Sequence, residues 1–151
     1  MNVLFLQKEG IDLYQVLIVS ETSREALRFY HPRQAPGGIT ITMASLGSAL
    51  SLVSDLRWYV KRYMRGVIFE ASEGIYCSHT LAKEVYYDRS EILTRPWKYR
   101  FRYIIRDNVV VDTECLSQGE RCTIPDSGNE VFLEVWCTSA EVTDVTGKKM
   151  E

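Results

Sequence analysis

The sequence predicts an α+β fold in which an antiparallel, strand-dominated sheet packs against one main amphipathic helix at about residues 48–65. Three observations lead to this prediction. Short β-branched and aromatic segments separated by polar turns recur along the chain. One segment changes to the three-and-four apolar spacing of a helix. Another alternates aromatic and basic residues, as a two-faced strand does.

The N-terminal elements are predicted strands. Residues 3–6 and 13–19 are aliphatic segments on either side of Gly10, so they predict a hairpin, and residues 26–30 predict a short third strand. Two prolines and two glycines between positions 31 and 38 predict a loop. Residues 39–43 alternate apolar and polar side chains, which predicts a half-buried strand.

The main helix is predicted from apolar residues that recur every three or four positions between Ser48 and Met64. Ser45 or Ser48 is expected to cap its start, because a side-chain hydroxyl can accept a bond from an unpaired backbone N–H. Gly66 stands where a left-handed residue would end the helix.

The remaining elements are also predicted strands. They cover residues 67–69, 75–77 and 84–87, then the alternating aromatic and basic segment 97–105. Asp107 and Asn108 predict a turn into a partner strand at 109–111, and residues 130–137 predict the last strand. We expect one globular domain over residues 1–145 and a frayed C-terminal tail at 146–151.

The net charge of −2 conceals a separation of charge along the chain. Residues 57–106 carry eleven basic and five acidic side chains, whereas residues 107–151 carry three and ten. Clustered cations in the middle third would attract the phosphates of nucleic acid or of anionic lipid. The candidate anion-binding residues, at helical spacing in one set and on one strand face in the other, are Arg57, Lys61, Arg65, Lys98, Arg100 and Arg102.

Two other interpretations of the charge separation stay open. The C-terminal carboxylates could neutralise the basic residues within the fold. Alternatively, the basic region of one copy could meet the acidic region of another, and head-to-tail contacts of this kind produce rings or filaments. A homo-oligomer is therefore expected.

The sequence contains no pattern typical of a common enzyme. It lacks the phosphate-loop, dinucleotide, zinc-protease and hydrolase signatures, and it has only two histidines. A thiol–imidazole pair of Cys77 and His79 is the one enzymatic alternative. Cysteines without a C-x-x-C pair do not suggest zinc. We expect no enzyme activity, no cofactor, no metal and no small-molecule substrate.

The first ten residues lack the basic and apolar regions of a secretory signal, and no apolar run approaches the length of a membrane span. We therefore expect a cytoplasmic or nuclear location, in a host cell or a virion, and reduced thiols at the four cysteines.

The order of several segments resembles the core of rhabdovirus matrix proteins. These segments are Gly-Gly-Ile-Thr-Ile-Thr at 37–42, the helix at 48–64, the strand at 67–69, Trp-Lys-Tyr-Arg-Phe-Arg-Tyr at 97–103 and Glu-Val-Phe-Leu-Glu-Val-Trp-Cys at 130–137. The resemblance implies a small, self-associating viral protein that links a nucleocapsid to a membrane.

A second, shorter resemblance concerns residues 65–87. Arg-Gly-Val-Ile-Phe at 65–69, Glu-Gly-Ile-Tyr at 73–76, Leu81 and Val-Tyr-Tyr at 85–87 are similar to the association domain of interferon-regulatory factors. That resemblance implies a β-sandwich that binds a host or partner protein through protein–protein contacts. It is the alternative to the matrix-like hypothesis.

Overall fold

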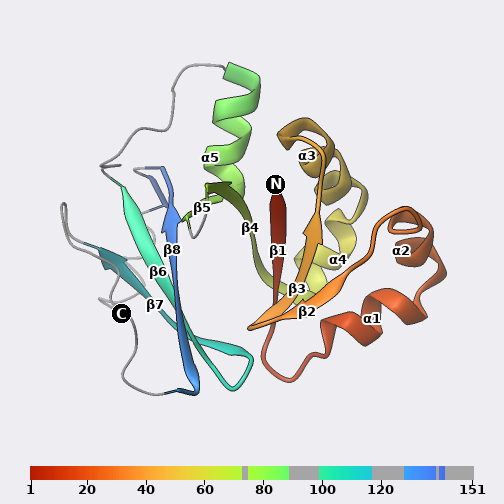
Figure 1. Ribbon diagram of the computed structural model, residues 1–151, viewed down its shortest axis with the longest axis horizontal. Coiled ribbons are helices and arrows are strands. Elements are labelled where there is room, and N and C mark those ends of the chain that lie inside the picture. The colour runs from red at the N-terminus through yellow and green to blue at the C-terminus, as the bar shows by residue number, and fades with distance from the viewer. Residues whose placement is uncertain (73–74, 89–98, 117–127, 139, 142–151) are drawn as a thin grey trace.

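The computed structural model describes residues 1–72, 75–88, 99–116, 128–138 and 140–141, and Figure 1 shows one curved sheet with its helices gathered beside the N-terminal strands. The α+β class holds. Predicted features at residues 97–98 and 146–151, Lys98 and the tail among them, lie outside the described residues.

The sheet has eight strands in the order β2-β3-β1-β4-β5-β8-β6-β7. These strands are β1 (Asn2–Gln7), β2 (Arg33–Ala35), β3 (Gly38–Thr42), β4 (Met64–Ser72), β5 (Ile75–Ser78), β6 (Arg100–Arg106), β7 (Val109–Leu116) and β8 (Glu130–Trp136). The prediction of an antiparallel sheet is wrong, because β5 and β8 pair in parallel. A long stretch of chain joins these two strands, so no tight turn forces them to run in opposite directions.

The prediction of one main helix at 48–65 is also wrong. Two helices occupy that stretch, α3 (Leu46–Asp55) and α4 (Arg57–Tyr63), and Leu56 interrupts them with ψ near 12°. The apolar spacing continues through the break, since Leu56 and Tyr59 are both buried, and for this reason the periodicity did not reveal it. Ser45 caps α3, as one of the two expected caps.

The N-terminal strand predictions fail after β1. Residues 13–19 form α1 (Leu13–Val19) and are followed by α2 (Glu21–Ala26). Asp12 caps α1 by accepting a hydrogen bond from the backbone N–H of Gln15 at 3.3 Å. Leu13 and Leu17, one helical turn apart, are the buried residues of α1. Burial of this pair outweighs the strand preference of the β-branched residues around it.

Three further predictions need correction. The expected loop at 31–38 contains the short edge strand β2, which pairs with β3. The expected strand at 84–87 is instead a π-helical turn, η1 (Glu84–Asp88), directly after α5 (His79–Lys83). Gly66 lies inside β4, where an added Cβ would come 3.0 Å from the hydroxyl oxygen of Tyr103. Gly66 therefore leaves room for the Tyr103 side chain. It does not end a helix, as the sequence predicted that it would.

The strands predicted at 39–43, 109–111 and 130–137 are confirmed by β3, β7 and β8. The predicted turn is confirmed too, because Asp107 and Asn108 both adopt positive φ angles between β6 and β7. Figure 1 shows the tip of this hairpin near the lower ends of β1 and β2. Gln7 fixes it there by donating a 3.0 Å hydrogen bond to the carbonyl of Asn108.

The sheet separates two hydrophobic cores. On the helix side, Val3 and Phe5 of β1 pack with helix residues such as Leu13, Leu52 and Leu56. On the other side, Leu4 and Leu6 pack against β6 and β7 through residues that include Phe101, Ile105 and Val110. The helices and the aromatic side chains of β6 therefore lie on opposite faces of the sheet.

Candidate functional site

The exposed side of α4 is the candidate functional site. The sequence Arg-Trp-Tyr-Val-Lys-Arg-Tyr of α4 contains three cations and no carboxylate. Tyr59 is the buried residue of this helix, so the cations on its other sides face solvent. The α4 face, as we name it, consists of the exposed residues Arg57, Trp58, Lys61 and Arg62 of α4, with the exposed Arg65 two residues past the helix in β4. Three of them, Arg57, Lys61 and Arg65, were predicted site residues.

Helix geometry favours positive charge at this place. Lys61 and Arg62 stand in the last turn of α4, where the helix dipole attracts cations. Lys8, from the loop after β1, donates a hydrogen bond from Nζ to the carbonyl of Lys61 at 3.2 Å. A third cation is thereby added beside the last turn of α4.

Trp58 gives the α4 face an apolar centre. Its side chain is 55% exposed, and the guanidinium of Arg62 lies 5.1 Å from its ring centroid. Tyr59 meets the same ring edge-on at 5.0 Å between centroids. Trp58 also lines a shallow depression together with Val19, the last residue of α1, which is 75% exposed. Cations and exposed apolar groups therefore share one surface.

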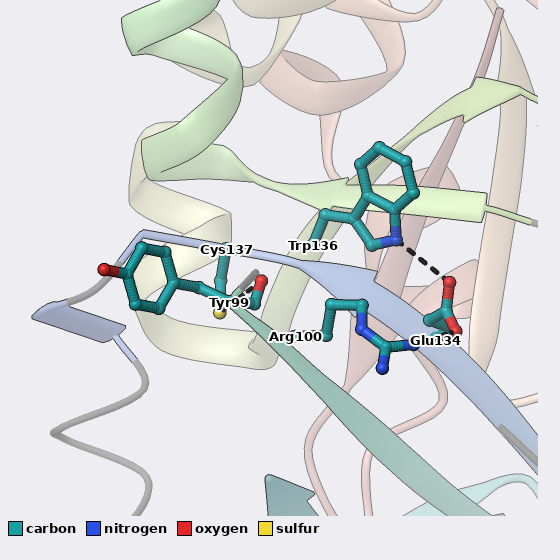
Figure 2. A network of polar contacts seen from close by, with 5 residues as sticks. All are labelled: Tyr99, Arg100, Glu134, Trp136 and Cys137. Atoms are coloured by element: carbon teal, nitrogen blue, oxygen red, sulfur yellow. Dashed lines mark hydrogen bonds and ion pairs between the residues drawn. The ribbon is translucent and has the colours of Figure 1, made fainter. Parts of the chain in front are cut away.

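The second predicted set, on β6, is engaged inside the fold. Arg100 has a side chain only 9% exposed and donates from Nη1 to Glu134 Oε1 at 2.9 Å. The other oxygen of Glu134 accepts a hydrogen bond from the indole N–H of Trp136, also at 2.9 Å. Figure 2 shows this network, with Tyr99 and Cys137 beside it, between β6 and β8.

Arg102 and Arg106 pair in the same way with carboxylates of neighbouring strands. Arg102 donates from Nε to Glu114 at 3.0 Å and lies over the ring of Phe132, and Arg106 pairs with Glu130 at 2.6 Å. All three β6 arginines thus pair with carboxylates of the acidic C-terminal third. This finding favours the interpretation that charge is neutralised within the fold for β6.

The two predicted basic sets do not form one patch. β5 and β8 lie between β4, which carries Arg65, and β6. Figure 1 shows α4 among the helices on the right and β6 on the left. Among the predicted site residues that the structure describes, Arg57 and Lys61 lie together on α4, and Arg65 lies two residues past this helix in β4. Arg100 and Arg102 are separate from them and paired with carboxylates.

The Cys77 and His79 pair lacks the features of an activated nucleophile. Cys77 is buried in β5, and burial raises the pKa of its thiol to about 12, so the thiol stays protonated at neutral pH. His79 begins α5, with its ring centroid 5.8 Å from that of Phe69. Cys77 is a free thiol.

The environment of His79 predicts how folding stability changes at acid pH. Burial, and then the charge of Lys83, lower the pKa of His79 in the folded chain below its usual 6.5. The unfolded chain therefore takes up this proton more readily, and folding stability falls as pH drops below about 6.5. In urea unfolding at pH 7.5 and 5.0, His79→Gln should lose less stability than the native chain does. Equal losses in the two proteins would contradict the assignment.

Sequence reasoning missed Trp58 and Val19 as site residues. Trp58 lies between the predicted site residues Arg57 and Lys61 in the sequence. This position could have indicated that it belongs to the same surface. Val19 gave no signal, because the sequence predicts a strand at 13–19, whereas Val19 lies beside Trp58 at the end of the helix α1.

Two features are absent from the described residues. Within ranges 1–72, 75–88, 99–116, 128–138 and 140–141, no helix has both the length and the apolar character needed to cross a membrane. The same part of the chain holds no group of three or more histidine, cysteine, aspartate or glutamate side chains suited to a metal ion.

The fold and the site define an α+β protein with a mixed sheet and an exposed helix face of cations around a tryptophan. The chain belongs to the "Family of unknown function (DUF5804)", whose sequence model matches residues 1–95. That segment includes all of α4. Comparisons with curated proteins and with solved structures give no match. The matrix-protein and association-domain resemblances are not tested by these comparisons and stay hypotheses.

Proposed function

We propose that this chain is a non-enzymatic protein that binds anionic membrane surfaces through the α4 face. The observation that carries the proposal is the exposed Trp58 ring among Arg57, Lys61 and Arg62, next to the exposed Val19. Tryptophan is favoured at the boundary between lipid headgroups and acyl chains, and each nearby Lys or Arg adds about 1 kcal/mol of attraction to an anionic surface.

A membrane suits this surface better than RNA does. Val19 and Ile18 are exposed aliphatic side chains at the end of α1, and they add nothing to base stacking or to phosphate binding. One side of the Trp58 ring is taken by Arg62. Insertion of aliphatic and indole groups between headgroups uses all of these residues at once.

The proposal keeps part of the matrix-like hypothesis. It retains a protein that engages an anionic membrane, and it does not depend on a viral origin. Self-association and binding of a host protein stay separate predictions. The β6 arginines, which pair within the chain, supply no charge for a head-to-tail contact.

Co-sedimentation with vesicles tests the proposal. The protein should bind vesicles of phosphatidylcholine with about 30% phosphatidylserine, bind weakly to phosphatidylcholine alone, and be released by high salt. Arg62→Ala with Arg65→Ala should weaken binding about 30-fold, because two cations contribute about 2 kcal/mol.

The matched control is Arg33→Ala with Arg106→Ala, which removes the same charge from exposed positions outside the α4 face. This control should bind within about twofold of the native chain. If both double variants weakened vesicle binding equally, net charge alone would explain the loss, and the α4 face would not be the binding surface. Binding of single-stranded RNA without binding to anionic vesicles would overturn the membrane proposal in favour of a nucleic-acid partner.

A further inference from the structure

A second hollow lies on the other side of α4, in the groove between α3, α4 and α5. Its volume is about 490 Å³, within the size range of small-molecule sites. It is lined by apolar and basic side chains of α3, α4 and α5 together with Ser54 and His79. We call this hollow the α4–α5 groove.

The polar part of the α4–α5 groove is cationic. Arg57 and Lys61 approach it from α4 and Lys83 from the end of α5, and the described residues that line it include no carboxylate. In the part of the chain that the structure describes, none of these three cations forms an ion pair. Their fields add in the groove, so an anion there would relieve their mutual repulsion.

The rest of the groove is apolar. Leu50 and Val53 of α3 are almost completely buried, and Val60 of α4 is half-buried. His79 stands between the two parts, with its pKa lowered by burial and then by Lys83. At neutral pH the imidazole is therefore uncharged, and a bound anion beside it would raise its pKa again.

We infer that the α4–α5 groove binds one phosphate monoester attached to a hydrocarbon chain. The phosphate lies against Arg57, Lys61 and Lys83, and the chain lies along Leu50, Val53 and Val60. This inference goes beyond the proposed membrane function and can stand without it, although Arg57 and Lys61 belong to both surfaces. The bilayer and the solution are two sources of such a molecule, and phosphatidate and a soluble alkyl phosphate share the required chemistry.

Octyl phosphate is a soluble probe for the groove, with inorganic phosphate and octanol as its two halves. Calorimetric titration should give an affinity for octyl phosphate at least tenfold higher than that for either half. Proton NMR should show the pKa of His79 rising when octyl phosphate binds. Similar affinities for octyl phosphate and inorganic phosphate would overturn the apolar part of the inference.

Two variants address the groove, and one addresses the α4 face alone. Lys83→Ala should weaken octyl phosphate binding about fivefold or more, and Ser54→Trp, at an exposed lining position, should block it by filling the groove. Trp58→Ala should leave octyl phosphate binding unchanged while it weakens vesicle binding. Unchanged octyl phosphate affinity in both groove variants would overturn the inference and leave the membrane proposal intact.

Vesicles separate the two sources. Addition of about 5% phosphatidate to phosphatidylcholine vesicles should increase binding of the native chain more than that of Ser54→Trp, if the bilayer supplies the ligand. Octyl phosphate binding that is lost in Ser54→Trp, with no vesicle binding by the native chain, would support the groove, identify a soluble phosphate ester as its ligand and overturn the membrane proposal.

Discussion

A Gly38→Ala variant is expected to lose at least about 3 kcal/mol of folding stability, which is a large part of the total for a chain of this size. A Cβ at position 38 would lie 1.8 Å from the carbonyl oxygen of Phe5. Relief of this clash requires β3 to move away from β1, where Gly38 pairs with Leu6. Phe5 and Leu6 are fully buried, one in each core, so both cores would be disturbed.

Urea unfolding followed by circular dichroism measures this loss. Gly128→Ala is the matched control, because nothing lies within 4 Å of the Cβ that it would add. That control should stay within about 0.5 kcal/mol of the native chain. A Gly38→Ala protein with nearly native stability would mean that β1 and β3 do not approach each other as described.

Replacement of Arg100 by methionine is expected to cost about 3–5 kcal/mol of folding stability. The Glu134 side chain, 18% exposed, would lose the cation that compensates its own burial. The methionine fills much of the same volume, so the loss reports charge and not a cavity. The Tm should fall accordingly in a thermal melt.

Arg106→Met is the control on the same strand, because its pair with Glu130 has an arginine side chain 56% exposed. Exposed pairs contribute little, so this variant should lose less than about 1 kcal/mol. Adding Glu134→Gln to Arg100→Met should recover part of the loss, since the amide oxygen can still accept from the Trp136 indole and carries no charge. A double variant that is as unstable as the sum of the two single ones would show that the pair is not coupled.

Local patterns in the sequence predicted those elements whose partners lie close along the chain. Asp107 and Asn108 adopt the positive φ angles of a tight turn, and both residue types tolerate that conformation, so the β6–β7 hairpin could be predicted. The parallel pairing of β5 with β8 depends on a long connection, so local patterns could not predict it. Residues 13–19 form a helix because Leu13 and Leu17 pack into the helix-side core. Local residue preferences carry no information about such tertiary contacts.

The candidate site could likewise be predicted only where it depends on residues close together in the sequence. Arg57 and Lys61 share a surface because residues four positions apart on α4 lie close together, which the sequence predicts. Arg65 lies in β4, past the end of α4, so helical spacing does not place it. The alternation of β6 was predicted correctly for Phe101 and Arg100, which face opposite sides. The burial of Arg100 was not predicted, because it depends on the register that places β8 beside β6 and brings Glu134 within reach.

The family segment ends at residue 95, before β6, whereas the sheet continues through β8, β6 and β7. Leu4, Leu6 and Ile68 belong to that segment and are buried by residues that follow it, such as Phe101 and Ile105. The residues of this hydrophobic core therefore come from both the matched segment and the part of the chain that follows it. Residues 1–95 alone would therefore leave this apolar strip of β1 and β4 uncovered.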